Sequence, residues 1–173
     1  MFSKRNKLLI KTILIATDFS LESLNILKKV LREKNSLDND FQYKIFLVSG
    51  YDSGESIRDL LFNKKAKIFS KIGPKEFVEV YNIITNKYPD LISKIVCDVF
   101  TGNFQRTFDQ YLKTTEVDEA YFANSLQYSN ENGKFDPFPF LRKTTLLEAQ
   151  QVKMQSQELL PEKGKIAEVF VDV

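Results

Sequence analysis

Apolar positions along the chain follow two different spacings, and the two alternate. Short, nearly continuous apolar runs are typical of strands covered on both faces, whereas apolar residues at helical spacing predict helices. The runs predicted to be strands are Ile13–Ala16, Lys44–Ser49, Lys94–Thr101, Val117–Asn124 and Ile166–Val173. The segments with helical spacing are 21–34, 56–72, 74–88, 104–115 and 140–160. This alternation predicts an α/β fold, with a five-stranded, mostly parallel sheet and helices on both of its faces.

The first predicted strand leads to a carboxylate. Within the stretch Thr12–Ser20, the apolar run meets Asp18, and the first helical pattern begins just after it. A carboxylate at the carboxyl edge of a parallel sheet can accept hydrogen bonds from a ribose or bind a cation. Alternatively, Asp18 and Ser20 cap the first helix, with Ser20 as the N-cap residue. The position of Asp18 favours neither interpretation over the other.

Two later connections carry further candidate features. Gly102 follows the third predicted strand and precedes a helix, where the absence of a side chain allows a tight turn. The polar segment Ser125–Pro139 is predicted to be the least structured part of the chain. Three phenylalanines in and after it, Phe135, Phe138 and Phe140, either form a ligand lid or partner surface or anchor the loop to the domain.

Composition limits the chemistry that the chain can perform. A chain of 173 residues, 43% of them hydrophobic and 28% charged, is suited to one globular domain over 1–173. Histidine is absent, which excludes Ser-His-Asp, Cys-His and His-metal sites. A net charge of +2 does not predict nucleic-acid binding, and no apolar run predicts a membrane span, so a cytoplasmic location is expected. The single cysteine, Cys97, lies in an apolar stretch and is expected to be buried.

The order and spacing of these segments resemble those of a universal stress protein. Residues 13–20, with the sequence Ile-Leu-Ile-Ala-Thr-Asp-Phe-Ser, and the helix that follows are similar to the opening of that family. Residues 45–49 are similar to its second strand. The succession of Val99–Gly102, a helix over 104–112 and a strand from Val117 is similar to its third strand, glycine, helix and fourth strand. The similarity extends from Lys11 to Ser125.

This resemblance implies the strand order 3-2-1-4-5 of a Rossmann-like, adenine nucleotide alpha hydrolase-like fold, with a nucleotide crevice between the first and fourth strands. In the ATP-binding branch of the family, the residues that correspond to Asp18 and Val48 contact the nucleotide. Gly102, Asn124 and Ser125 would complete a residual crevice of this kind.

The phosphate-binding pattern of the family is replaced in this sequence. The family has Gly-x-x-Gly after the fourth strand, and Gly-Ser or Gly-Thr further along. When the fourth strands are aligned, Ala123, Leu126 and Asp136-Pro137 stand at those positions, and the loop's only glycine is Gly133. Side chains keep phosphate from the backbone, a carboxylate repels it, and proline has no amide proton. We therefore expect that ATP does not bind in the usual way.

These observations predict a non-enzymatic regulatory or stress-response module without catalytic residues, metal ligands or a cofactor. It is expected to form a homodimer through the apolar strand Ile166–Val173, and an unidentified protein partner is compatible with this role. The alternative is a protein that binds a small molecule or an adenine nucleotide, ATP or AMP, at the Asp18 crevice, with weak hydrolase activity and the segment Ser125–Pro139 as a lid.

Overall fold

The computed structural model describes residues 9–37, 40–52, 75–124, 126 and 133–154. The strands are β1 (Leu9–Ala16), β2 (Phe41–Tyr51), β3 (Ile92–Phe100), β4 (Glu119–Phe122), β5 (Lys134–Phe135) and β6 (Ala149–Gln151). The helices are α1 (Leu24–Ser36), α4 (Lys75–Lys87), α5 (Gln105–Thr114) and α6 (Phe138–Lys143). The predicted helix over 56–72 and the predicted strand Ile166–Val173 lie outside the described residues.

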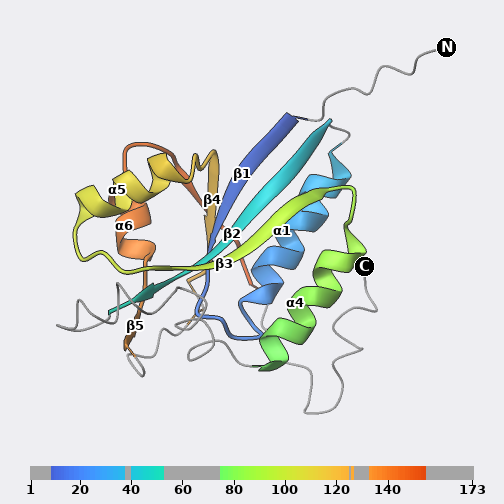
Figure 1. Ribbon diagram of the computed structural model, residues 1–173, viewed down its shortest axis with the longest axis horizontal. Coiled ribbons are helices and arrows are strands. Elements are labelled where there is room, and N and C mark those ends of the chain that lie inside the picture. The colour runs from blue at the N-terminus through green and yellow to red at the C-terminus, as the bar shows by residue number, and fades with distance from the viewer. Residues whose placement is uncertain (1–8, 38–39, 53–74, 125, 127–132, 155–173) are drawn as a thin grey trace.

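Five of these strands form a parallel sheet with the order β3-β2-β1-β4-β6 (Figure 1). β1 lies in the middle, where Ile13, Leu14 and Ile15 are fully buried. A strand in this position is covered on both faces, which explains its continuous apolar sequence. The predicted α/β fold is confirmed, and the first four strands have the predicted order.

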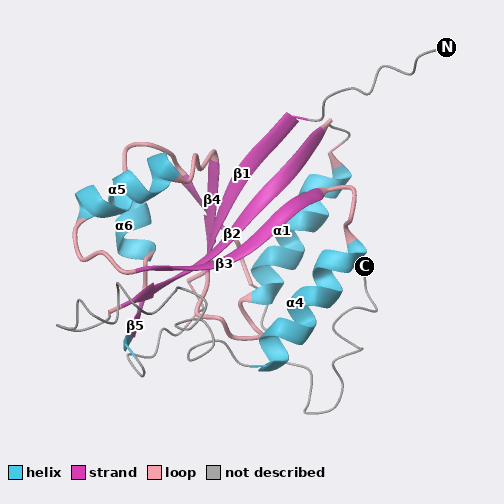
Figure 2. Cartoon of the chain, viewed as in Figure 1, coloured by secondary structure: helices cyan, strands magenta, loops and turns pink. Residues whose placement is uncertain are grey.

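Helices cover both faces of the sheet (Figure 2). Ile13 and Ile15 of β1 join a core beneath α1 and α4, whereas Leu14 and Ala16 join a second core beneath α5 and α6. Successive strand residues point to opposite faces, so β1 contributes to both cores. No helix among the described residues is long and apolar enough to cross a membrane.

The end of the described chain differs from the prediction of one helix over 140–160. α6 spans only Phe138–Lys143, and its C-cap residue, Thr144, has an extended backbone. The chain then returns to the sheet as β6, which pairs in parallel with β4. β6 thus holds the place beside β4 that was predicted for Ile166–Val173. Its two glutamines are exposed, so this outer strand lacks the apolar run that marks the inner strands.

The segment predicted as a loop over Ser125–Pro139 contains a sixth strand. β5 pairs antiparallel with the end of β2, through Gly50↔Phe135 and Tyr51↔Lys134. The described residues thus form the predicted five-stranded parallel sheet and one further, short antiparallel strand. A strand of two residues is too short to show a period of alternation, so the sequence pattern does not reveal it.

The three phenylalanines of this region anchor it to the domain, as one of the two interpretations predicted. The ring of Phe138 stacks on Phe122 of β4 with centroids 4.0 Å apart. The rings of Phe135 and Phe140 lie 6.3 and 5.6 Å from the ring of Phe100, at the end of β3. Aromatic pairs at these distances are attractive beyond the area that they bury.

Candidate functional site

Asp18 closes a tight turn between β1 and α1. Its Oδ1 accepts hydrogen bonds from the Ser20 amide at 2.9 Å and from the Ser20 hydroxyl at 2.5 Å. A carboxylate that binds the amide two residues ahead forms an Asx turn. The prediction that Ser20 is the N-cap is wrong, because a separate turn intervenes and α1 begins at Leu24, with Ser23 as its N-cap.

Phe19, next to Asp18, has a left-handed backbone with φ of 58°, which is uncommon for a bulky residue. Its side chain is fully buried, and its ring meets Phe77 of α4 edge to face at 5.5 Å. Its amide donates to Thr17 Oγ1 at 2.9 Å, and that hydroxyl lies 2.6 Å from the hydroxyl of Ser23. Burial and hydrogen bonding therefore hold a locally unfavourable turn in place.

Val48 lies beside this turn, near the carboxyl end of β2. Its carbonyl accepts the Thr17 amide at 2.9 Å, and its side chain is fully buried on the α5 and α6 face. β1 stops pairing with β2 at Ala16↔Val48, whereas β2 continues to Tyr51. The last residues of β2 can therefore pair with another strand on the side where β1 has ended.

β5 takes the place that β1 leaves. At Gly50, β3 pairs on one side through Phe100, so β5 must pair on the other side through Phe135. The Asp52 amide adds a hydrogen bond to the Gly133 carbonyl at 2.6 Å. The segment from Gly133 to Phe135 therefore extends the sheet across its carboxyl edge, next to the turn after β1.

Two glycines permit this close pairing. A Cβ atom at Gly50 would lie 2.4 Å from the ring of Phe135 and 2.5 Å from its carbonyl oxygen. Gly133 has a φ of 77°, and a Cβ atom there would lie 2.5 Å from the carbonyl oxygen of Asp52. No sequence pattern connects the two positions, although a glycine in a strand is a general signal of close backbone approach.

Lys134 joins β5 to the turn after β1. Its Nζ donates a hydrogen bond to the main-chain carbonyl of Asp18 at 3.3 Å. Lys134 was not among the predicted site residues, because a lone lysine in a polar loop carries no pattern. Its contact joins the loop to the main chain of the turn at Asp18.

The other predicted site residues have different surroundings. Gly102 is needed for space rather than for a left-handed turn, because a Cβ atom there would lie 2.6 Å from Thr107 Cγ2 and 2.7 Å from the Phe100 ring. Asn124 is exposed and follows β4, the strand next to β1. Ser125 lies outside the described residues. The ends of the parallel strands thus bring Asp18, Val48 and Asn124 to one edge of the sheet.

The residues aligned with the family's phosphate loop have structural contacts of their own. Ala123 and Leu126 are buried, 7% and 9% exposed, in the core beneath α1 and α4. Asp136 Oδ1 accepts the Phe138 amide at 2.8 Å at the start of α6, and burial raises the pKa of this carboxyl group. The side chains at these positions therefore pack the core or begin a helix.

No metal site was found within the part of the chain that the structure describes, since no three His, Cys, Asp or Glu side chains gather there. Cys97 is partly buried against the core beneath α1 and α4. Burial, and to a lesser extent the charge of Asp98, raise the pKa of its thiol to about 12. The thiol is therefore protonated at neutral pH, which does not suit a nucleophile.

Comparison with known proteins adds to this geometry. No protein-family model matches the sequence, and no curated protein is detectably similar to it. Among solved structures, hypothetical protein PH0823 superposes with a TM-score of 0.50 at 16% identity, over 83% of this chain and 95% of that chain. At this identity the likeness shows the fold alone. The strand order 3-2-1-4 that the resemblance to universal stress proteins implied is the order observed in the sheet.

Two solved universal stress proteins also match. One, from Burkholderia pseudomallei, has a TM-score of 0.48 and 8% identity, with coverage of 82% of this chain and 95% of that chain. The other, from Arabidopsis thaliana with AMP bound, has a TM-score of 0.45 and 14% identity, with coverage of 91% and 98%. The bound AMP is a property of that protein.

Proposed function

We propose that this chain is a cytoplasmic, non-enzymatic regulatory or stress-response module that does not bind ATP in the usual way of universal stress proteins. The observation that carries the proposal is β5, which pairs with the end of β2 across the edge where the nucleotide is expected. In an open α/β sheet, ligands bind outside the carboxyl ends of the strands. Here a segment of the chain itself extends over that edge.

The side chains at this edge are consistent with the proposal. One oxygen of the Asp18 carboxylate is engaged by Ser20, and the carbonyl of the same aspartate accepts Lys134. The ring of Phe135 lies against Gly50, close enough to exclude any side chain there. A nucleotide that entered in the family's manner would have to displace these contacts as well as bind.

Thermal unfolding of the wild-type protein with and without ATP or AMP at millimolar concentration tests the proposal. Because a ligand that binds only the folded state raises its stability, we expect no shift in Tm with either nucleotide. Phosphate release from ATP should equal that of a sample without protein. A saturable upward shift with either nucleotide would contradict the proposal.

A second function is favoured by one feature of Asp18. Both of its recorded hydrogen bonds use Oδ1, so among the described residues Oδ2 has no partner. This oxygen could accept a ribose hydroxyl, in which case the chain would bind an adenine nucleotide or another small molecule, with weak hydrolase activity. A nucleotide-dependent Tm shift that is lost in Asp18→Ala, but kept in the exposed-site control Asp90→Ala, would establish binding at this site.

The homodimer through Ile166–Val173 is part of the proposed function. Support comes from the sequence, since an apolar, β-branched segment offers an edge that a second copy can pair with. Light scattering at micromolar concentration should give twice the 20.1 kDa mass of one chain. Replacing Val169 and Val171 by lysine should restore the monomer mass, and a monomeric wild-type protein would refute the dimer.

A further inference from the structure

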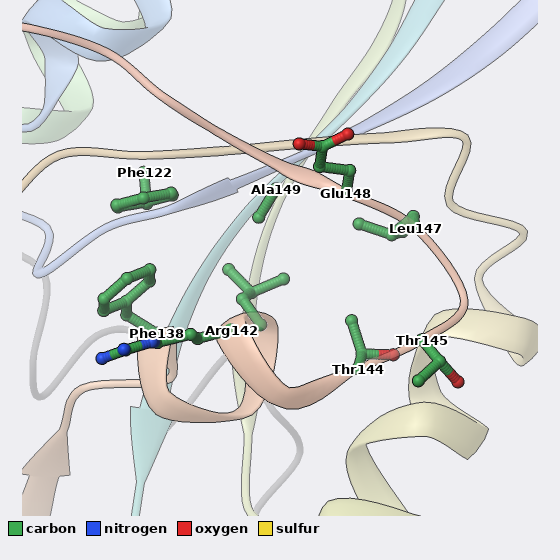
Figure 3. A pocket seen from close by; sticks show the side chains of 9 residues that line it. Phe122, Phe138, Arg142, Thr144, Thr145, Leu147, Glu148 and Ala149 are labelled. Carbon is green, nitrogen blue, oxygen red and sulfur yellow. The ribbon is translucent and has the colours of Figure 1, made fainter.

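A cavity of about 590 Å³ opens between α6 and the part of the sheet formed by β4 and β6 (Figure 3). Apolar and polar side chains both line it, the polar ones being Arg142, Thr144, Thr145 and Glu148. Phe122 and Phe138, whose rings stack, form one end, and Leu141, which is 1% exposed, comes from the inner side of α6. Leu147 and Ala149 contribute from the chain that leads into β6. None of the residues that line the cavity belongs to the candidate site at Asp18.

The short α6 explains why this cavity exists. A helix of six residues rises only about 9 Å, so α6 itself covers only a short length of the sheet. The chain over 144–148 then moves outward before it rejoins the sheet as β6. The space between this segment, α6 and the sheet remains unfilled by the described side chains.

The two charged residues that line the cavity, Arg142 and Glu148, point in different directions. Arg142, in the last turn of α6, extends toward the end of the cavity where Phe138 lies (Figure 3). The carboxylate of Glu148 points away from the cavity, since Leu147 and Ala149 on either side of it point inward. Among the described residues, no carboxylate forms an ion pair with Arg142. Of the two charged residues that line the cavity, Arg142 is therefore the one whose charge can face a bound ligand.

We propose that this cavity binds an amphipathic organic anion, an apolar body that carries one carboxylate or similar acidic group. The apolar body lies between Phe122, Leu141 and Leu147, and the acidic group meets the guanidinium of Arg142. Arginine forms bidentate hydrogen bonds with carboxylates, which gives the preference for an acid. The volume lies within the roughly 300–1,000 Å³ of small-molecule sites, which combine apolar walls with placed polar groups.

Three eight-carbon ligands with different head groups test the charge preference. The reporter is the fluorescence of 8-anilinonaphthalene-1-sulfonate, an aromatic anion, in the wild-type protein under native conditions. We expect octanoate to displace the dye at a concentration roughly tenfold lower than 1-octanol, the difference that one charge-assisted hydrogen-bonded pair supplies. Octylammonium should compete more weakly than either. Equal displacement by octanoate and octylammonium, or the absence of dye binding, would overturn the proposal.

Variants locate the site and its charge. Arg142→Gln keeps most of the side-chain stem but removes the charge, so octanoate should bind roughly tenfold more weakly while 1-octanol is little affected. Lys143→Gln, which removes the neighbouring charge outside the cavity lining, is the matched control and should change octanoate binding less than about threefold. Equal losses in the two variants would refute a specific role for Arg142.

A substitution that fills the cavity provides the second test. Ala149→Phe places a ring where the side chain already points inward, so it should abolish binding of octanoate and of 1-octanol alike. Circular dichroism and the unfolding midpoint establish that the variant is folded. Unchanged octanoate affinity in folded Ala149→Phe would show that the ligand binds elsewhere. These results are independent of the nucleotide tests, because no residue is common to the two sites.

Discussion

The two ends of the parallel sheet are stabilised by different kinds of interaction. At the amino end, Lys34 of α1 is only 7% exposed, and its Nζ lies 2.6 Å from Glu119 Oε2 at the start of β4. Tyr121 donates to the same oxygen at 2.7 Å, and Lys11 Nζ lies 3.7 Å from Oε1. At the carboxyl end, β5 is held by main-chain pairing that depends on two glycines, Gly50 and Gly133.

This difference indicates which changes each end tolerates. The amino end depends on charged groups that are present, so it is vulnerable to their removal. The carboxyl end depends on the missing side chains of Gly50 and Gly133, so it is vulnerable to an added atom. The loss of a buried partner leaves a charge uncompensated, whereas an added Cβ atom separates two strands.

The ionisation of the amino-end cluster follows from its contacts. Burial alone would lower the pKa of Lys34, but the hydrogen bonds with Glu119 and Tyr121 outweigh it and raise the pKa above the ordinary value. Burial alone would raise the pKa of Glu119, but Lys34 and Tyr121 lower it. Both partners are therefore charged at neutral pH.

Removing the buried cation should have the largest effect. Lys34→Met keeps the length of the apolar stem but leaves Glu119 without its closest charged partner, so the free energy of unfolding should fall by roughly 3 kcal/mol. Urea unfolding at about pH 7 measures this change. Lys113→Met, in the last turn of α5 and far from such a cluster, should change stability by less than about 0.5 kcal/mol. A loss no larger than that of the control would show that the ion pair is dispensable.

Adding one methyl group at the carboxyl end should have the next largest effect. Gly50→Ala brings a Cβ atom within 2.4 Å of Phe135, so β5 should separate from β2 at a cost of about 1–3 kcal/mol. Hydrogen exchange of the Asp52 amide, which binds the Gly133 carbonyl, should become at least tenfold faster. Protection of this amide as in the wild type would contradict the described pairing. The amide of Ile15, in the centre of the sheet, serves as the internal control.

Glu119 at the amino end and Asp136 after β5 should contribute to the pH dependence of stability with opposite signs. The pKa of Glu119 is lowered from 4.5 on folding, so its stabilisation is present above pH 4.5 and is lost as the pH falls through the lower folded value. The pKa of Asp136 is raised from 3.8, so its contribution is favourable below pH 3.8 and is lost as the pH rises through the higher folded value.

Urea unfolding as a function of pH tests these signs. Glu119→Gln should be destabilised at neutral pH and should lose less stability than the wild type on acidification. Asp136→Asn should gain stability relative to the wild type as the pH rises from acid to neutral, since the amide can still accept the Phe138 amide. Parallel pH profiles for the wild type and either variant would contradict the corresponding assignment.

The smallest effect is expected at Lys134. Its one recorded hydrogen bond, to the Asp18 carbonyl, is 3.3 Å long and partly exposed, so Lys134→Ala should cost about 0.5 kcal/mol or less. Urea unfolding again provides the measurement, in low and high salt. A loss of stability comparable to that of Gly50→Ala would mean that the lysine, rather than the main-chain pairing, fixes β5.

The inner strands and the amphipathic helices of this protein were predictable from its sequence, and the edges were not. β1 and β2 lie inside the sheet and are buried on both faces over most of their length, so the fold requires long apolar runs that are visible in the sequence. β5 and β6 are two and three residues long and lie outside the central core. Such short strands form where the main chain of another strand can pair with them. The pattern of residue types does not show where that pairing occurs.

The candidate site divides in the same way. Its expected carboxylate, Asp18, follows the end of a strand, which the sequence marks clearly. The contacts of that carboxylate with Ser20 are local, and the capping interpretation anticipated them in part. Lys134 and Gly133 reach the same edge from far along the chain, and no periodicity places them there.

By itself, therefore, the sequence determined the α/β class, the buried centre of the sheet and the carboxylate at its edge, because burial on both faces imposes a pattern on consecutive residues. Tertiary structure alone decided that β5 lies across this edge, that β6 is the neighbour of β4, and that a cavity forms beside Arg142. Each of these features depends on main-chain groups or short segments that meet across long separations in the chain. Whether these segments come into contact depends on the space available in the folded molecule. The local spacing of residue types does not specify that space.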